Sequence, residues 1–454
     1  MNERAIVISD IHLSQPPMPL MMRHPAALAN FIGDLPRRAH PNERVHLIVA
    51  GDFIDFLAMQ PFDAITLDSA VAGRKLLDAL AGENACVVEA LRSASRDGVR
   101  LVVMAGNHDL ELAHPAVQNA FMELLGDIPM RPEFIVHGQA WRRGGLLVEH
   151  GNRYDGANEN DWDGMRELVS SQSRGQALHT RDKFNFGQLV HPSAGSQLVT
   201  QVLNSVRHRY PFVPLMQPEG VLTALLLRVL EPSLGFDWKK VARLLQTQEA
   251  AQRNAPSGRR NIAATTQDGD AELDRVFGEE YRSLLQPAAM REIGATDWLR
   301  LFASERADSI AQCLRRGEVP SSGVLQRLQL LLRRMHLDEA AFSLSGDTGE
   351  LGAAAAMMHG REGIQTVVMG HTHVPRQVGD APIPSYINTG TWTDFVRVPP
   401  EAMIDSANGR NALSTFLGNM CRDDAASRTF EPTFAEIELC DDVVLTACLR
   451  RADH

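Results

Sequence analysis

The chain has 454 residues, of which 44% are hydrophobic and 22% are charged. This composition supplies enough apolar surface for a sizeable core and excludes a fully disordered chain. With 45 basic and 56 acidic residues, the formal net charge is -11. An acidic chain disfavours indiscriminate binding of nucleic acid, because phosphate contacts need a basic surface, although a local basic groove stays possible.

The first part of the chain predicts strands that alternate with helices. Short β-branched runs end in polar turns at Arg4–Ser9, Val45–Ala50 and Val99–Ala105. Helices are expected between them at Pro25–Leu35 and Gly73–Arg96, where apolar residues recur at helical spacing. Further strands are predicted at Glu133–His137, Leu146–Glu149 and Thr366–Met369, and a closing hairpin at Phe434–Glu438 and Val443–Leu449.

Helical periodicity dominates between Gly156 and Arg361 and indicates a helical insertion. The expected domains are therefore a core in two parts, residues 1–155 and 362–454, and an insertion over 156–361. Its candidate helices are Val221–Leu230, Trp238–Gln252, Ala271–Leu285, Thr296–Arg316, Val324–His336 and Glu350–His359.

The cysteines and the first residues of the chain indicate the cellular compartment of the protein. The five cysteines form no C-x-x-C pair, so neither a disulfide framework nor a thiolate zinc site is indicated. The first residues enter a short apolar strand instead of a signal-peptide core, and no apolar run approaches about 20 residues. We therefore expect a cytoplasmic protein without a transmembrane segment.

Clusters of polar residues directly follow five of the predicted strands. Because the carboxyl ends of strands in an open α/β sheet meet at one crevice, residues remote in sequence can converge there. The clusters are Asp10-Ile11-His12, Gly51-Asp52-Phe53-Ile54-Asp55, Gly106-Asn107-His108-Asp109, His150-Gly151-Asn152 and Gly370-His371-Thr372-His373.

Carboxylate, imidazole and amide donors without cysteine suit divalent manganese, iron or zinc better than calcium, which prefers oxygen throughout. A set of seven ligands with one shared carboxylate matches two cations about 3.5–4 Å apart.

The five motifs D-x-H, G-D-x-x-D, G-N-H-D, H-G and G-H-x-H, in this order, resemble those of the calcineurin-like metallophosphoesterase superfamily. The resemblance covers roughly residues 1–155 and 362–454. It implies an α/β fold, a metallophosphoesterase β-sandwich flanked by helices, with the large α-helical insertion as a lid or specificity domain. It also implies two divalent metal ions, Mn²⁺ before iron or zinc, that activate water to hydrolyse a phosphoric ester.

The resemblance further assigns roles to single residues. One cation would be held by Asp10, His12, Asp52 and His373, and Asp52 would bridge to a second cation held by Asn107, His150 and His371. His108 would be the unliganded imidazole beside the phosphate, where it protonates the leaving oxygen or only stabilises it. Asp109 would orient His108, and Asp55 would support the loop from outside the ligand shell.

The substrate is less defined. The run Ser9–Leu13 and an insertion before G-H-T-H resemble the UDP-2,3-diacylglucosamine pyrophosphatase branch, which cleaves a nucleotide–lipid pyrophosphate. That branch has arginine in place of His108 and aspartate in place of Asn152. Because of these two differences the substrate class stays broad, and we expect a phosphodiester, a pyrophosphate or a phosphomonoester. One alternative is a nuclease that resembles the double-strand-break repair exonucleases. Another is a non-catalytic, metal-bound scaffold that presents the insertion to a protein partner.

Overall fold

The computed structural model describes residues 2–38, 43–156, 158–175, 190–215, 310–323, 325–326, 328–329, 352, 355–356, 358–396 and 398–452. The predicted helices Val221–Leu230, Trp238–Gln252 and Ala271–Leu285 lie outside these residues, as do most of the two that follow them. The chain divides into two compact units: Met1–Asn204 with Phe342–Asp394 and Phe430–His454, and Ser205–Ala341 with Phe395–Thr429. The expected insertion boundaries, 156 and 361, stay a prediction.

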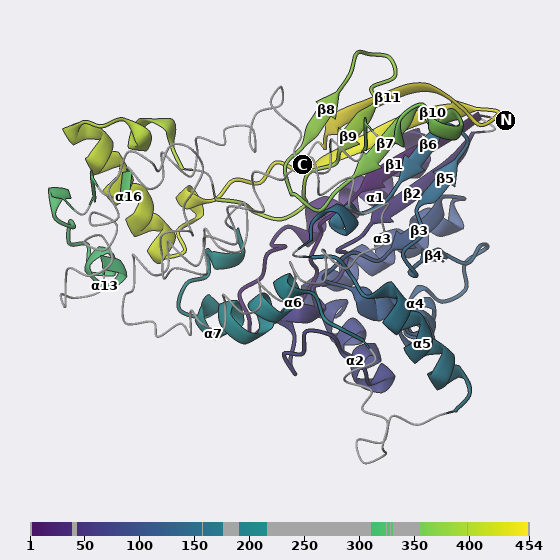
Figure 1. The fold of residues 1–454 in the computed structure, drawn as a ribbon, viewed down its shortest axis with the longest axis horizontal. Helices are drawn as coiled ribbons and strands as arrows, with labels where there is room; N and C mark the ends of the chain where they lie inside the picture. The colour runs from purple at the N-terminus through teal and green to yellow at the C-terminus, as the bar shows by residue number, and fades with distance from the viewer. Residues whose placement is uncertain are drawn as a thin grey trace. The chain divides into compact units, whose positions relative to one another are not determined.

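The first unit is built on two mixed sheets (Figure 1). In the first sheet, β1 to β4 run parallel and the hairpin β10–β11 pairs antiparallel to β1. Its strands, in spatial order, are β11 (Val443–Arg451), β10 (Thr433–Cys440), β1 (Asn2–Ile8), β2 (Arg44–Ala50), β3 (Arg100–Met104) and β4 (Glu133–Ile135). The predicted N-terminal strands and the closing hairpin are thus confirmed.

The second sheet has three parallel central strands and one antiparallel strand at each edge. In spatial order it contains β5 (Trp141–Arg143), β6 (Leu146–Val148), β7 (Thr366–Met369), β9 (Tyr386–Asn388) and β8 (Arg376–Val378). The pairing of β6 with β7 joins the two flanks of the expected insertion in one sheet.

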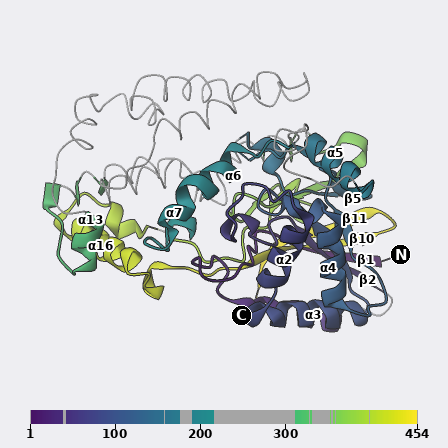
Figure 2. The same cartoon turned by 90° about the horizontal axis from the view of Figure 1, so that it is seen from below.

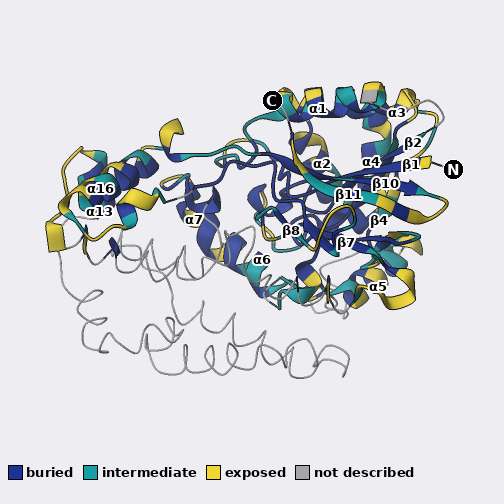
Figure 3. Cartoon of the chain, turned by 90° about the horizontal axis from the view of Figure 1, so that it is seen from above, coloured by how far each residue is buried: buried dark blue, intermediate teal, exposed yellow. Residues whose placement is uncertain are grey.

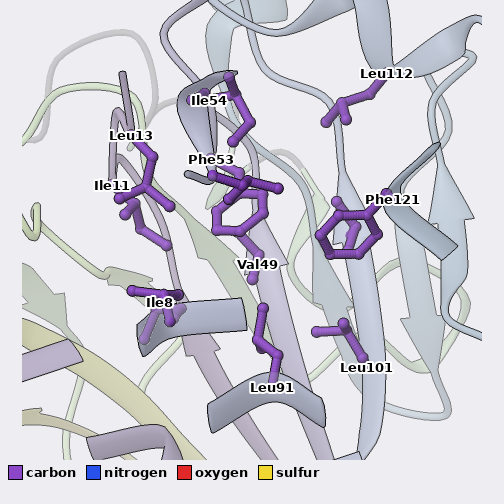
Figure 4. Close-up of a cluster of buried hydrophobic side chains, with 14 of the residues drawn as sticks. Ile8, Ile11, Leu13, Val49, Phe53, Ile54, Leu91, Leu101, Leu112 and Phe121 are labelled. Atoms are coloured by element: carbon purple, nitrogen blue, oxygen red, sulfur yellow. The ribbon is translucent and has the colours of Figure 1, made fainter. Parts of the chain in front are cut away.

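Alternation along the strands explains the layers. In β1, Ala5 and Val7 belong to a core between the two sheets, whereas Ile6 and Ile8 belong to a core on the helical side, because successive side chains of a strand point to opposite faces. Figure 4 shows Ile8, Val49 and Leu101 near Leu91 of α3 in this helical-side core. The result is the expected α/β sandwich flanked by helices.

Helices lie on both outer sides of this unit, α3 on one and α5 on the other (Figure 2), and the strands between them are largely buried (Figure 3). The first-unit helices are α1 (Pro25–Arg38), α2 (Ser69–Ala79), α3 (Ala85–Arg96), α4 (Pro115–Leu125), α5 (Trp162–Ser173) and α6 (Ala194–Leu198). Among the helices described, none has the length and apolarity to cross a membrane.

The single helix predicted over Gly73–Arg96 is wrong, because two helices, α2 and α3, cover this stretch. The helical conformation is interrupted at Ala81, whose backbone is extended, and at Gly82, whose φ is 59°. The Asn84 side chain stabilises the break, since its Nδ2 donates to the carbonyl of Ala79 at 2.8 Å and to that of Ser14 at 3.0 Å. The apolar spacing continues through this break, so periodicity alone does not reveal it.

The second unit is described only in part. Its helices α13 (Ile310–Arg315) and α16 (Ala407–Cys421) pack together, and Arg315 Nε donates to the carbonyl of Cys421 at 3.2 Å. The guanidinium of Arg315 also lies 4.7 Å from the ring centre of Tyr210. The short helix α7 (Asn204–Arg207) begins at the boundary of the two units.

An ion network around the buried Glu3 carboxylate connects the two sheets of the first unit. Glu3 of β1 is bonded by Arg44 of β2 at 3.1 Å, by His46 of β2 at 3.0 Å and by Arg143 of β5 at 2.6 Å. Burial by itself would raise the pKa of Glu3, but Arg143 and His46 outweigh it and hold this pKa below 4.5. Glu3 therefore favours the folded state only while it is ionised.

Glu3→Gln should lower the free energy of unfolding by about 1–2 kcal/mol at neutral pH, because it removes the charged acceptor of the partly exposed guanidinium groups of Arg44 and Arg143. Since the folded pKa is depressed, this contribution is present above pH 4.5 and disappears as the pH falls through the folded pKa. Urea unfolding at neutral and acidic pH measures the difference. The control Glu89→Gln, at a side chain 63% exposed, should change little at either pH. A cost for Glu3→Gln that is the same at both pH values contradicts this account.

Candidate metal centre

The predicted polar clusters all follow strands of the first unit, but they come from two sheets. The loops after β1, β2 and β3 belong to the first sheet, and those after β6 and β7 to the second. Backbone hydrogen bonds join the loops: the amide of Ile11 donates to the carbonyl of Asp52 at 2.9 Å, and the amide of Gly370 donates to that of His150 at 2.9 Å. The C-terminal ends of strands from facing sheets thus form one site.

The backbone is strained where the candidate ligands lie. Positive φ angles occur at Asp10 (53°), His12 (53°), Asp52 (52°), His371 (72°) and His373 (57°). Non-glycine residues rarely adopt this left-handed conformation, which costs of the order of 1–2 kcal/mol each, and such outliers cluster at functional sites. The fold therefore holds five candidate ligands in turns that they would not adopt for stability alone.

Glycines in three of the motifs give these turns room. A Cβ on Gly51 would lie 2.5 Å from the ring of His150, one on Gly106 2.2 Å from Asp52 Oδ1, and one on Gly370 2.5 Å from Asp10 Oδ2. Each glycine therefore lets a candidate ligand from a neighbouring loop approach its backbone closely.

Gly106→Ala should weaken Mn²⁺ binding by about 10-fold or more, because its methyl group would displace the Asp52 carboxylate. The shift would involve backbone as well, since the same Cβ would lie 2.7 Å from the amide nitrogen of Asp52. Calorimetric titration with Mn²⁺ measures the effect. Gly33→Ala is the matched control, since a Cβ on Gly33 of α1 meets no atom within 4 Å. Unchanged Mn²⁺ affinity in Gly106→Ala would refute the packing argument.

The first group of donors consists of Asp10, His12 and His373. His373 Nε2 lies 3.1 Å from His12 Nε2 and 3.3 Å from Asp10 Oδ1. The other carboxylate oxygen of Asp10, Oδ2, accepts hydrogen bonds from the Ser9 hydroxyl and from the backbone amide of His371. Among the described residues, the buried Oδ1 accepts no hydrogen bond. Asp10 is thus fixed by Oδ2, while its Oδ1 faces His373 Nε2.

The second group consists of Asp52, His150 and His371, with Asn107 beside it. His150 Nδ1 lies 2.8 Å from the Ala50 carbonyl, which can only accept, so this nitrogen carries a proton. His150 Nε2 then faces two oxygens, Asn107 Oδ1 at 3.2 Å and Asp52 Oδ2 at 3.3 Å. Without a proton, the lone pair on Nε2 would repel these two oxygens. Either a proton on Nε2 or a cation between the three atoms removes this repulsion.

Asp52 lies between the two groups. Its Oδ1 accepts a hydrogen bond from the backbone amide of His108 at 2.9 Å. Its Oδ2 lies 3.8 Å from His12 Nε2 of the first group and 3.3 Å from His150 Nε2 of the second. One carboxylate oxygen therefore stands within reach of both sets of donors.

The charges at the site fit divalent cations. Burial alone would lower the pKa of His150, but the Asp52 carboxylate outweighs it and raises this pKa to about 10. Burial would likewise raise the pKa of Asp10, yet the neighbouring His373 lowers it to about 2. The protein therefore maintains ionised carboxylates here and favours positive charge beside them. Together with the carboxylate and imidazole donors, this fits divalent metal ions.

His108 lies beside these groups, with its ring centre 4.7 Å from that of His12. Its Nδ1 is 3.0 Å from Asp55 Oδ1. The structure thus differs from the expectation that Asp109 orients this imidazole. Asp109 instead accepts backbone hydrogen bonds from Gly106 at 2.6 Å and from Phe53 at 2.7 Å. The side chain of Asp109 turns back to fasten the loops after β2 and β3 to each other, so it is not available to His108.

Burial and the nearby Asp52 carboxylate raise the pKa of Asp109 to about 7. The backbone amides of Gly106 and Phe53, which donate to its two oxygens, act against this rise because they stabilise the carboxylate. Its observed contacts support a structural role.

Asp155 and Asn158 contact the site but were not among the predicted residues. Asp155 Oδ2 lies 2.9 Å from His371 Nε2, and Asn158 Oδ1 lies 3.5 Å from Asn107 Nδ2. Their only sequence signal is position, since both follow His150 within eight residues. Polar residues are common in such turns, so position alone does not distinguish them.

Comparison with protein families gives a match over the first part of the chain. The sequence profile of the family described as calcineurin-like phosphoesterase matches residues 3–191. These residues include the loops after β1, β2, β3 and β6, whereas the loop after β7 lies beyond the matched region. No curated protein matches the chain.

Proposed function

We propose that this chain, which belongs to the calcineurin-like phosphoesterase family through residues 3–191, hydrolyses a phosphoric ester with two divalent cations. The observation that carries this proposal is the placement of Asp52 Oδ2 between His12 Nε2 at 3.8 Å and His150 Nε2 at 3.3 Å. A carboxylate shared by two donor sets is what a pair of cations about 3.5–4 Å apart requires.

The first cation would be held by Asp10, His12, Asp52 and His373, and the second by Asp52, Asn107, His150 and His371. We propose Mn²⁺ for both, with iron and zinc as the other ions that this donor set accepts. Bound there, the ions would supply Lewis acidity, which neutralises phosphate oxygens and makes water acidic enough to act as a nucleophile near neutral pH.

The protein's own contribution to bond cleavage would come from His108. Its Nδ1 faces the Asp55 carboxylate at 3.0 Å, and a carboxylate can only accept, so this nitrogen keeps its proton. The other ring nitrogen, Nε2, would then donate a proton to the leaving oxygen as the phosphorus–oxygen bond breaks. Asp55 would hold the ring in place and stabilise its positive charge before the transfer.

The substrate class is a phosphodiester, pyrophosphate or phosphomonoester, for which a nucleotide or a nucleotide–lipid is the leading candidate. The insertion over 156–361 would act as lid or specificity domain. Five free cysteines fit a reducing, cytoplasmic compartment. A non-catalytic scaffold is less well supported, because all seven candidate ligands are present and converge in two groups.

An assay with bis-p-nitrophenyl phosphate, p-nitrophenyl phosphate and single-stranded DNA tests the proposal. We expect Mn²⁺-dependent release of p-nitrophenol that a chelator abolishes and that added Mn²⁺ restores. Preferential turnover of DNA would favour the nuclease alternative. No turnover of any of these with Mn²⁺, Fe²⁺ or Zn²⁺ would contradict the proposed activity.

A further inference from the structure

Asp155 lies where the chain returns to the metal centre after His150. The turn passes through Gly151, whose φ is 107°, and the short 3-10 helix Asn152–Tyr154, and Asp155 follows directly. Its Oδ2 lies 2.9 Å from His371 Nε2, with the Asp155 side chain 34% exposed and that of His371 9% exposed. A carboxylate from the loop after β6 therefore contacts an imidazole from the loop after β7.

This contact determines how His371 can bind a cation. A carboxylate only accepts hydrogen bonds, so His371 Nε2 must carry a proton that it donates to Asp155. In a neutral imidazole the other nitrogen, Nδ1, then holds the lone pair that a cation needs. His150 shows the reverse arrangement, in which the Ala50 carbonyl takes the Nδ1 proton and Nε2 faces the site.

Asp155 acts from outside the group of donors. Among the described residues, the donors that converge with Asp52 and His150 include His371 but not Asp155. The position of Asp155 is itself restrained, because Asn158 Nδ2 donates to the same Oδ2 at 2.7 Å and Asn152 Nδ2 donates to the Asn158 carbonyl at 2.8 Å. The turn thus holds the carboxylate against the imidazole.

We expect the influence of Asp155 to be confined to the second group of donors. Asn158 Oδ1 also lies 3.5 Å from Asn107 Nδ2, at the upper limit of a hydrogen bond, so the same turn reaches two donors of the second group. In the first group, His12 Nδ1 is buried and has no hydrogen-bond partner among the described residues. The turn that carries Asp155 and Asn158 therefore contacts donors of the second group.

We propose that Asp155 is a positioning residue for the second cation: it fixes the tautomer and orientation of His371 and so sets the affinity of that cation but not of the first. The inference rests on the proposed two-cation function. Loss of a carboxylate behind a metal-binding imidazole typically weakens binding by about 10–100-fold. Asp155→Ala should therefore bind its first Mn²⁺ as the wild type does and its second about 10–100-fold more weakly.

Calorimetric titration of the full-length protein with Mn²⁺ tests this, together with electron paramagnetic resonance, which distinguishes an isolated Mn²⁺ from a coupled pair. At one equivalent the two proteins should give the same signal, and at two equivalents only the wild type should show the coupled pair. Asp155→Asn should fall between them, because its amide oxygen still accepts the His371 proton but carries no charge. The control Asp163→Asn, at a side chain 90% exposed in α5, should match the wild type.

The outcomes separate this inference from the proposed function. If Asp155→Ala binds the second Mn²⁺ as tightly as the wild type, or loses both ions in equal measure, the positioning role is refuted while wild-type hydrolysis stands. A wild-type protein that binds two Mn²⁺ but hydrolyses no phosphoester refutes the proposed activity and leaves the role of Asp155 intact. A wild-type protein that binds fewer than two ions overturns both.

Discussion

Replacing Asp52 with asparagine should lower the Mn²⁺-dependent kcat/KM for bis-p-nitrophenyl phosphate by at least about 10³-fold, or about 4 kcal/mol of transition-state stabilisation. The amide retains the size of the carboxylate and an oxygen for the His108 amide, which Asp52 Oδ1 accepts at 2.9 Å. It removes the negative charge and replaces the oxygen between His12 and His150 by a donor. The loss should therefore come from the cations and not from the fold.

Steady-state kinetics and calorimetric Mn²⁺ titration of the Asp52→Asn protein together check this. Both binding steps should weaken, in contrast to the single step affected at Asp155. The control is Asp78→Asn, at an exposed position of α2, which should leave kinetics and metal binding unchanged. Near-normal turnover in Asp52→Asn would refute the shared-carboxylate role.

The second large effect is expected at His108 and depends on the leaving group. His108→Gln should lower kcat/KM by about 10²–10⁴-fold for an ester of an alkyl alcohol, whose leaving oxygen needs a proton. For p-nitrophenyl esters the loss should be much smaller, since p-nitrophenolate leaves without protonation. Asp55→Asn should reproduce the same pattern more weakly, because Asp55 acts through the imidazole at 3.0 Å.

Kinetics on a matched pair of alkyl and p-nitrophenyl phosphodiesters measure this pattern. His191→Gln serves as the control, because His191 is 77% exposed and contacts Asp161 away from the donors. An equal loss for both leaving groups would mean that His108 only binds phosphate, and would contradict the acid role.

The local part of the site was predictable from the sequence. Each candidate ligand follows a short apolar strand within a few residues, and strand ends are marked by composition alone. Asp10, His12 and His373 converge in one group, although the strands that precede them, β1 and β7, belong to different sheets. The resemblance to a known family then supplied the division of the ligands between two cations.

Contacts between loops were not predictable in the same way. Asp55 and Asp109 are both acidic residues close to His108 in the motifs, and which of them meets the imidazole depends on how the loops after β2 and β3 pack. The contact of Asp155 with His371 joins residues 216 positions apart. The same limit applies to α2 and α3, because the break between them depends on a hydrogen bond from Asn84 to Ser14 of another loop.

The most direct test of the central claim is a crystal structure of the Mn²⁺-soaked protein with anomalous difference density measured at the manganese edge. We predict two peaks about 3.5–4 Å apart, one among Asp10, His12 and His373, the other among Asn107, His150 and His371, with Asp52 between them. A single peak, or manganese bound away from these side chains, would contradict the account.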